Sequence, residues 1–421
     1  MLLVNARASR GPYPPELRAI LSVANARESS AWLSGWAGIR RGPTPLYELP
    51  GLATTLGVAR ILLKDESVRS DVGSFKALGA PIALVRWIRR VNPAQRIEPH
   101  ALLAGACEPL LRNFTVISAT DGNHGKGLAA AARSIGCRCV IVLHANVSVE
   151  REQAIARYGA TIIRIDGNYD DSVREASRLA EVNGWHVVSD TSYEGYEHVP
   201  RDVMQGYATI AAEIVAAMPA SPDSAPPFTH VFLQAGVGGL AAGIVSYFWE
   251  IYGEHRPQVV IVEPREADCL YQSAIQGVAA KATGSVDSIM AGLACGETSP
   301  LAWRFLVDSA DIFMTVNDDD AMRAMRVLAH GNESDVPIVA GESGAAGLAG
   351  LDVAMKNPDD ARRAGLGRDA RVLLINTEGA TAPTVYRRLV GEPAEAVLSR
   401  QHAFLARQAD RAADASQSSP R

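Results

Sequence analysis

The chain alternates between short runs of apolar, β-branched residues and longer stretches rich in alanine and glycine. An apolar run followed by a glycine-rich turn and a helix-forming stretch is typical of parallel α/β sheets, whose strands are buried on both faces. Seven runs are close to the roughly five or six residues usual for such a strand. The predicted strands are 114–118, 139–143, 161–165, 186–189, 229–234, 259–263 and 371–376.

The first four predicted strands form a compact βαβ block. The helices between them should begin near Gly125, Val149 and Tyr169. A connection rich in proline and serine, 219–227, separates this block from the second series, because proline removes amide donors and fixes φ. The segment 99–107 has the character of a variable loop, and the alanine-rich tail beyond Gln401 that of a fraying helix.

Composition narrows the class of function. The 421 residues are 48% hydrophobic and 21% charged, which is ordinary for a globular protein with two or three cores. A net charge of -5 argues against nucleic-acid binding, and no apolar run approaches the roughly 18 residues of a membrane span. Five cysteines without a Cys-x-x-Cys pair predict reduced thiols and no metal site. We expect a cytoplasmic protein that acts on small molecules.

Lys76 lies in the stretch Ser-Phe-Lys-Ala-Leu-Gly-Ala, where its neighbours suit a lysine that forms a Schiff base with an aldehyde cofactor. Such a lysine must lose its proton, and both apolar surroundings and nearby positive charge promote that loss. A single lysine in a helix-forming run is more often a solvated side chain. The prediction of pyridoxal 5'-phosphate therefore depends on the segments that accompany Lys76.

A glycine-rich turn follows the predicted strand 229–234. Its glycines would let backbone N–H groups approach a phosphate at the start of the next helix. The turn lacks the Lys-Ser/Thr of a nucleotide P-loop, which favours a cofactor with one terminal phosphate. The alternative is a tight packing turn between strand and helix. The candidate phosphate-binding residues are Gly236, Val237, Gly238 and Gly239.

The segment 118–127 also joins a strand to a helix. Thr120 and the neighbouring amides are candidates for substrate binding, Asp121 could hold or move a proton, and Asn123 could bond a phenolic oxygen of the cofactor. The alternative is that these residues supply only turn and cap chemistry. We interpret His124 as structural.

Two further polar residues follow predicted strands directly. Asp190 lies at a carboxyl end, where open α/β sheets place ligands, although a helix cap is an equal alternative. Thr377 could bond a pyridine nitrogen through its hydroxyl; a neutral partner leaves that nitrogen largely unprotonated, which suits β-elimination. Its neighbour Glu378 stays open as the partner instead. Glu342 is either an acid lining the site or a cap.

In this order, the segments resemble the fold-type II pyridoxal-phosphate enzymes, and within that family most closely the 2,3-diaminopropionate ammonia-lyases. The matching segments are 43–46 (PTPL), 63–66 (LKDE), 74–76 (SFK), 119–125 (ATDGNHG), 185–196 (WHVVSDTSYEGY), 204–207 (MQGY), 234–238 (QAGVG), 262–264 (VEP), 289–297 (IMAGLACGE) and 341–345 (GESGA). The resemblance implies two three-layer α/β domains with mostly parallel sheets. The large domain would comprise 1–80 and 201–400, the small inserted domain 81–200, and the tail 401–421.

The resemblance also implies a role for each candidate. Lys76 would bind the cofactor covalently, Asn123 would contact its ring oxygen, 236–239 its phosphate and Thr377 its ring nitrogen. Asp121 and Asp190 would be two bases, because mirror-image substrates present their α-protons on opposite faces of the cofactor. Asp121 would serve the D isomer and Asp190 the L isomer.

The implied activity is elimination of ammonia from D- and L-2,3-diaminopropionate, giving pyruvate and two ammonia. The main alternative is a dehydratase or ammonia-lyase acting on serine, threonine or hydroxyaspartate, which shares the cofactor and expels water. A non-catalytic protein that keeps the cofactor is a remote alternative. Enzymes of this family are commonly homodimers, and we expect the same here.

Overall fold

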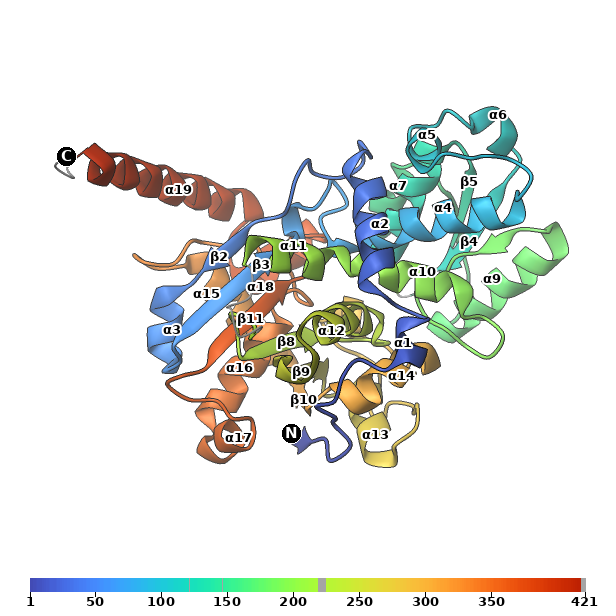
Figure 1. The fold of residues 1–421 in the computed structure, drawn as a ribbon. Coiled ribbons are helices and arrows are strands. Elements are labelled where there is room, and N and C mark those ends of the chain that lie inside the picture. Colours follow the sequence, from blue (N-terminus) through green and yellow to red (C-terminus); the bar gives the residue numbers. More distant parts are fainter. Residues whose placement is uncertain (121, 146, 219–224, 418–421) are drawn as a thin grey trace.

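Two sheets organise the computed structural model of the protein, which describes residues 1–120, 122–145, 147–218 and 225–417 (Figure 1). The larger sheet has seven strands, and the smaller sheet has four. In spatial order the larger sheet contains β1 (Leu2–Val4), β10 (Ile312–Val316), β9 (Gln258–Pro264), β8 (His230–Gln234), β11 (Arg371–Asn376), β3 (Arg60–Asp65) and β2 (Leu46–Glu48). The smaller sheet contains β6 (Thr161–Arg164), β5 (Arg138–Leu143), β4 (Thr115–Ala119) and β7 (His186–Val187).

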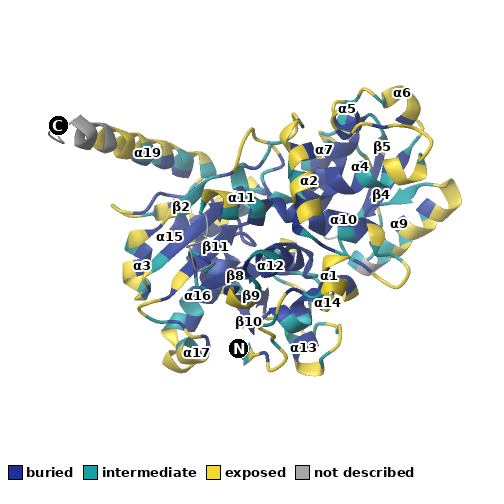
Figure 2. Cartoon of the chain, viewed as in Figure 1, coloured by how far each residue is buried: buried dark blue, intermediate teal, exposed yellow. Residues whose placement is uncertain are grey.

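Both sheets are mostly parallel, which confirms the predicted fold class. Only the two edge strands of the larger sheet, β1 and β2, run antiparallel to their neighbours. Alternate residues of the central strands enter two separate cores: Val231 and Val259 pack on one face, whereas Phe232 and Val260 pack on the other. Helices therefore cover both faces of this sheet, and its central strands are buried in Figure 2.

The helices fall into two groups along the chain. Those near the smaller sheet are α4 (Gly79–Val91), α5 (Pro99–Leu103), α6 (Glu108–Leu111), α7 (Asn123–Ile135), α8 (Val149–Ala156) and α9 (Tyr169–Asn183). The others are α1 (Pro15–Arg18), α2 (Val23–Ser34), α3 (Pro50–Leu56), α10 (His198–Tyr207), α11 (Thr209–Ala217), α12 (Gly239–Tyr252), α13 (Cys269–Gln276), α14 (Pro300–Ser309), α15 (Asp318–His330), α16 (Ala346–Lys356), α17 (Pro358–Arg363), α18 (Pro383–Val390) and α19 (Ala394–Gln417). Within the described residues, no helix is both long enough and apolar enough to cross a bilayer.

The predicted strands all occur, with ends that differ by no more than two residues, and the predicted tail helix is α19. The interpretation of 99–107 as a loop is wrong for its first half. Pro99 occupies the first turn of α5, where its fixed φ is compatible with a helix, and the side chains of Leu102 and Leu103 are buried. The expected connection 219–227 lies mostly outside the described residues.

The segment that carries Lys76 is packed tightly against two helices. It forms η2, a single 3₁₀ turn from Phe75 to Ala77, directly before α4. A Cβ on Gly127 of α7 would lie 2.6 Å from the carbonyl oxygen of Lys76, and one on Gly206 of α10 would lie 2.4 Å from that of Leu78. Only glycine permits these backbone approaches, which fix the position of Lys76 between the two sheets.

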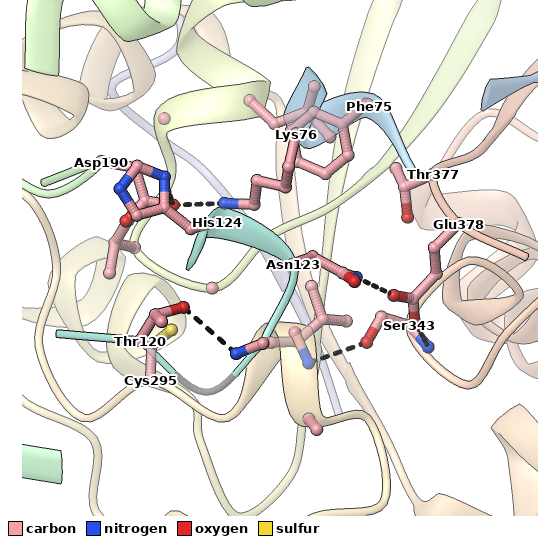
Figure 3. Close-up of a pocket in the computed structure, with 18 of the residues that line it drawn as sticks. Phe75, Lys76, Thr120, Asn123, His124, Asp190, Cys295, Ser343, Thr377 and Glu378 are labelled. Carbon is pink, nitrogen blue, oxygen red and sulfur yellow. Dashed lines mark hydrogen bonds and ion pairs between the residues drawn. The ribbon is translucent and has the colours of Figure 1, made fainter. Parts of the chain in front are cut away.

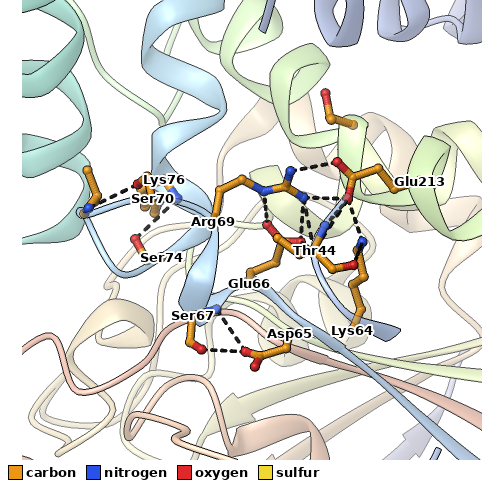
Figure 4. Close-up of polar contacts among 12 residues, drawn as sticks. Thr44, Lys64, Asp65, Glu66, Ser67, Arg69, Ser70, Ser74, Lys76 and Glu213 are labelled. Atoms are coloured by element: carbon orange, nitrogen blue, oxygen red, sulfur yellow. Dashed lines mark hydrogen bonds and ion pairs between the residues drawn. The ribbon is translucent and has the colours of Figure 1, made fainter. Parts of the chain in front are cut away.

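A buried ionic network precedes this segment (Figure 4). The guanidinium of Arg69 donates to Glu66 at 2.7 Å and to both carboxylate oxygens of Glu213, on α11, at 2.7 and 2.8 Å. Lys64 Nζ donates to Glu213 at 2.6 Å and to the carbonyl of Thr44 at 2.7 Å. Each charge therefore has an opposite charge and a hydrogen bond within the protein, as burial requires.

We predict that Arg69→Met destabilises the protein by about 3–5 kcal/mol, because Glu66 and Glu213 would remain buried without their main cation. The Arg69 and Glu66 side chains are 1% and 0% exposed, so water cannot replace the lost partner. Urea unfolding followed by circular dichroism measures the change.

The matched control is Arg362→Met. Arg362 pairs with Asp359 on α17, and both side chains are 77% exposed, so this replacement should leave the urea midpoint almost unchanged. Equal effects of the two replacements would show that the buried network is not a major source of stability.

Candidate active site

One pocket collects the predicted site residues from both sheets (Figure 3). Thr120, Asn123 and Asp190 reach it from the loops after strands of the smaller sheet. The turn Gly236–Gly239 and Thr377 reach it from the carboxyl ends of β8 and β11, where parallel sheets place ligands. Lys76 lies between the two groups. Asp121 lies outside the described residues.

Lys76 Nζ donates to a carboxylate oxygen of Asp190, and the two side chains are 17% and 18% exposed. The same nitrogen lies 5.1 Å from the ring centre of Phe75 and 5.6 Å from that of Tyr207. Ser74 Oγ accepts a hydrogen bond from the Lys76 amide at 3.4 Å, and the amide of Phe75 donates to the Thr377 carbonyl at 3.0 Å. Backbone bonds thus set the direction of the lysine.

The electrostatics of this pair differ from the sequence expectation. Burial alone would lower the pKa of Lys76, but the carboxylate of Asp190 outweighs it and holds that pKa above its ordinary value. Burial likewise would raise the pKa of Asp190, but the charge of Lys76 holds it well below its usual range. In this structure Lys76 is therefore an ammonium, because its neighbour is a carboxylate and not a second cation.

The turn between β8 and α12 has the shape of an anion cradle. A Cβ on Gly236 would lie 2.6 Å from Cys295 Sγ, and Gly238 has φ +99°, a conformation that favours glycine. The turn leads into the N-terminus of the 14-residue helix α12, which lines the pocket with Gly239. Helix N-termini of this kind favour a phosphate group.

A hydrogen bond that the sequence analysis missed fixes the hydroxyl of Thr377. Gln234 Nε2 lies 2.8 Å from the Ile375 carbonyl, 3.1 Å from the Gly344 carbonyl and 3.1 Å from Thr377 Oγ1. Carbonyls only accept, so this atom is the amide nitrogen and Thr377 Oγ1 accepts from it. The hydroxyl proton of Thr377 remains free to donate. Gln234 is the last residue of β8, just before the glycine turn. This position at the carboxyl end of a predicted strand could have indicated from the sequence that Gln234 belongs to the site.

Glu378, the alternative to Thr377, is held by several donors. Asn123 Nδ2 donates to Glu378 Oε2, the Ser343 amide donates to Oε1 at 3.0 Å, and Thr381 Oγ1 donates to Oε2 at 3.4 Å. The Asn123 amide therefore joins the start of α7 to the segment after β11. Both side chains line the pocket.

Helix α8, beside the smaller sheet, also contacts segments of the larger sheet. Arg151 Nη2 donates to Glu342 Oε1 at 3.0 Å, and Glu150 accepts from the amide and the hydroxyl of Thr384 at 3.2 Å. Glu342 is 2% exposed. It is thus an ion-pair partner across the pocket region, and neither the cap nor the simple lining acid considered from the sequence. Arg151 itself lines the pocket.

The pKa of Glu342 is raised from 4.5 to about 7, chiefly by burial and then by the neighbouring carboxylate of Glu378, against the opposing effect of Arg151. A raised pKa means that the folded protein retains a proton that the unfolded chain releases. The contribution of Glu342 to stability is therefore full below pH about 4.5 and is lost as the pH rises through about 7.

We predict that Glu342→Gln raises the melting temperature at pH 8, where the native carboxylate is ionised at a cost of roughly 1–3 kcal/mol, and that this gain shrinks toward pH 5. Differential scanning fluorimetry at both pH values measures it. Glu395→Gln, at an exposed position of α19, is the control and should show no such trend. A difference between Glu342→Gln and the native protein that is independent of pH would contradict the prediction.

Comparisons with known proteins agree with this geometry. The model of the family described as "Pyridoxal-phosphate dependent enzyme" matches residues 39–378. The chain is 40% identical over 369 residues to diaminopropionate ammonia-lyase of Escherichia coli strain K12, covering 86% of this chain and 90% of that one.

Two crystal structures of the Escherichia coli diaminopropionate ammonia lyase are similar to the whole chain. Its holo form and its complex with D-serine each match with a TM-score of 0.83 and 37% identity, and each match covers 93% of this chain and 96% of that one. The overall fold of this chain is therefore similar to that of a solved enzyme.

Proposed function

The chain belongs to the family of pyridoxal-phosphate dependent enzymes, and within that family we propose that it is an ammonia-lyase acting on 2,3-diaminopropionate. The overall reaction converts one diaminopropionate and one water into pyruvate and two ammonia. The observation that carries the proposal is the contact of Lys76 Nζ with the Asp190 carboxylate, inside the pocket that also contains the glycine turn. This contact supports the proposal, because a carboxylate that could act as a base lies beside the amine that would hold the cofactor.

The described residues fit pyridoxal 5'-phosphate. The turn Gly236–Gly239 offers backbone N–H groups and a helix N-terminus to the phosphate, and Lys76 offers an amine to the aldehyde. We assign the ring oxygen to Asn123 and the ring nitrogen to the Thr377 hydroxyl, whose proton the bond from Gln234 leaves free. When bound, this cofactor withdraws electrons from the α-carbon of an amino acid.

The protein's own groups supply the proton chemistry. We assign Asp190, which contacts Lys76, to remove the α-proton of the L isomer, and Asp121 to serve the D isomer. Asp190 holds the Lys76 ammonium, so it becomes a stronger base when that charge moves away. We assign Thr120, next to Asp121 in the same loop, to substrate binding.

Exclusion of water would protect the reacting groups, and contacts between the two halves support it. The bonds from Arg151 to Glu342 and from Asn123 to Glu378 join elements of the smaller sheet to elements of the larger one. We propose that residues 81–200 form a small domain inserted between 1–80 and 201–400, and that these contacts help to keep it closed over the substrate.

We further propose that the enzyme is a cytoplasmic homodimer. We propose a dimer because enzymes of this family are commonly homodimers. We propose the cytoplasm because the cysteine content of the chain suits a reducing compartment. Size-exclusion chromatography with light scattering measures the oligomeric state.

The proposed function predicts that the purified protein releases pyruvate from D- and L-2,3-diaminopropionate faster than from D- or L-serine. A coupled lactate dehydrogenase assay measures pyruvate from each of the four amino acids. Lys76→Ala should lose activity by a factor of about 1,000 or more, together with the visible absorbance of the bound cofactor.

The serine arms of this assay separate the proposed function from its main alternative. Faster turnover of serine would identify a dehydratase, and a coloured protein that releases pyruvate from none of the four would point to a different substrate. The matched control for Lys76→Ala is Lys356→Ala, because Lys356 pairs with Asp352 on the surface of α16 and does not line the pocket.

The assignment of Asp190 predicts that Asp190→Asn selectively impairs the L isomer. Asparagine keeps the size of the side chain but cannot accept the α-proton, so kcat on L-diaminopropionate should fall by about 100-fold or more, with a much smaller change on the D isomer. Steady-state kinetics on both isomers measure the ratio. An equal loss on both would contradict the assignment of separate bases.

A further inference from the structure

The backbone determines which nitrogen of His124 carries a proton. His124 Nε2 lies 2.8 Å from the carbonyl oxygen of Val188, and both atoms are buried. A carbonyl can only accept, so Nε2 must carry a hydrogen and donate it. In the neutral imidazole, Nδ1 is consequently the bare nitrogen.

That bare nitrogen points at the base of the site. His124 Nδ1 lies 3.8 Å from Asp190 Oδ2, and no hydrogen-bond partner for it occurs among the described residues. The two side chains lie beside each other in Figure 3. His124 is 5% exposed, so water does not satisfy the nitrogen either. An unsatisfied buried polar atom is costly and needs an explanation, of which a role in catalysis is one.

Lys76 and His124 share one atom of Asp190. Lys76 Nζ donates to Oδ2, the same oxygen that faces His124 Nδ1. While the ammonium occupies this oxygen, the carboxylate has no proton to offer His124. Once Asp190 is protonated, its hydroxyl can donate to Nδ1 after a small rotation, since hydrogen bonds at active sites often tighten only with substrate present.

We propose that His124 receives the proton that Asp190 removes from the substrate, so that the two side chains act together as one proton-holding pair. This inference rests on the proposed function. The α-C–H bond breaks with its electron pair left on carbon, and an O–H bond forms on Asp190. That O–H bond then breaks as an N–H bond forms at His124 Nδ1, giving an imidazolium beside a restored carboxylate. The proton then returns from Nδ1 to Asp190 and passes to the leaving β-amine, which departs as ammonia.

A second buried histidine provides a comparison for a purely structural role. His230 Nε2 bonds the Ala364 carbonyl at 2.9 Å, and His230 Nδ1 pairs with Thr229 Oγ1 at 2.7 Å. Both of its nitrogens thus have partners, and neither faces the pocket. His124 has the same carbonyl bond, but its other nitrogen faces an acid. The earlier interpretation of His124 as structural accounts only for the Val188 bond.

Two substitutions of His124 distinguish the role of Nε2 from the role of Nδ1. In His124→Gln, the amide can still donate to the Val188 carbonyl, but nothing accepts a proton at the position of Nδ1. In His124→Asn, the shorter amide lies near the position of Nδ1 and loses the Val188 bond. His230→Gln is the control for replacement of a buried histidine.

We expect His124→Gln to lower kcat on L-diaminopropionate by about 10- to 100-fold, with KM within about threefold and little change on the D isomer. The deuterium isotope effect with α-deuterated L substrate should increase, because proton removal becomes slower. His230→Gln should change neither. Three results with His124→Gln would overturn the proposal: full activity, an equal loss on both isomers, or an unchanged isotope effect. A loss of activity in His124→Asn alone would also overturn it, because that result would show that His124 acts only through its hydrogen bond to Val188.

A spectroscopic measurement tests the tautomer without any turnover. In nitrogen-15 NMR spectra of the cofactor-free protein, the His124 signals, identified among the nine histidines by their absence from His124→Gln, should show a protonated Nε2 and a bare Nδ1. A protonated Nδ1 would overturn the proposal. If the native enzyme releases no pyruvate from either isomer, the proposed function fails, and this spectrum still decides the state of His124.

Discussion

The contact between the Lys76 ammonium and the Asp190 carboxylate is the interaction on which the rest of the site depends. Each side chain is less than a fifth exposed, so each would lose its charge to desolvation if the other were absent. Lys76 comes from the segment before α4, and Asp190 follows β7. The two charges are stable only when these segments are docked correctly, so the pair links correct docking to the chemical state of the site.

The scaffold holds Lys76 by backbone contacts and a neighbouring ionic network. Close approaches at Gly127 and Gly206 leave no room for the segment to shift, and the Arg69 network anchors the chain immediately before it. Such support matters because a reactive group must stay within a fraction of an ångström of its productive position. The site therefore requires tight packing around this short 3₁₀ turn, because the packing holds Lys76 in position.

The sequence predicted the central strands because burial on both faces makes them continuous apolar runs. It missed β1, β2, β10 and β3. In β3, Lys64 and Asp65 interrupt the apolar pattern, and their hydrogen-bond partners lie elsewhere in the chain. Lys76, Asp190 and Thr377 could be recognised locally, because each is part of a distinctive segment or directly follows a strand. The bonds from Gln234 to Thr377 and from Arg151 to Glu342 could not, because 143 and 191 residues separate the partners.

The geometry around Asp190 also links the attachment of the cofactor to the strength of the base. While Lys76 is an ammonium, it holds the pKa of Asp190 well below the usual range, and the carboxylate is a weak base. Any step that moves this positive charge away strengthens Asp190 as a base, and in the proposed pair His124 Nδ1, 3.8 Å from Asp190 Oδ2, would then accept its proton. The base thus becomes effective only when the lysine is engaged elsewhere. A carboxylate positioned without these two neighbours would have the same basicity at every stage of the reaction.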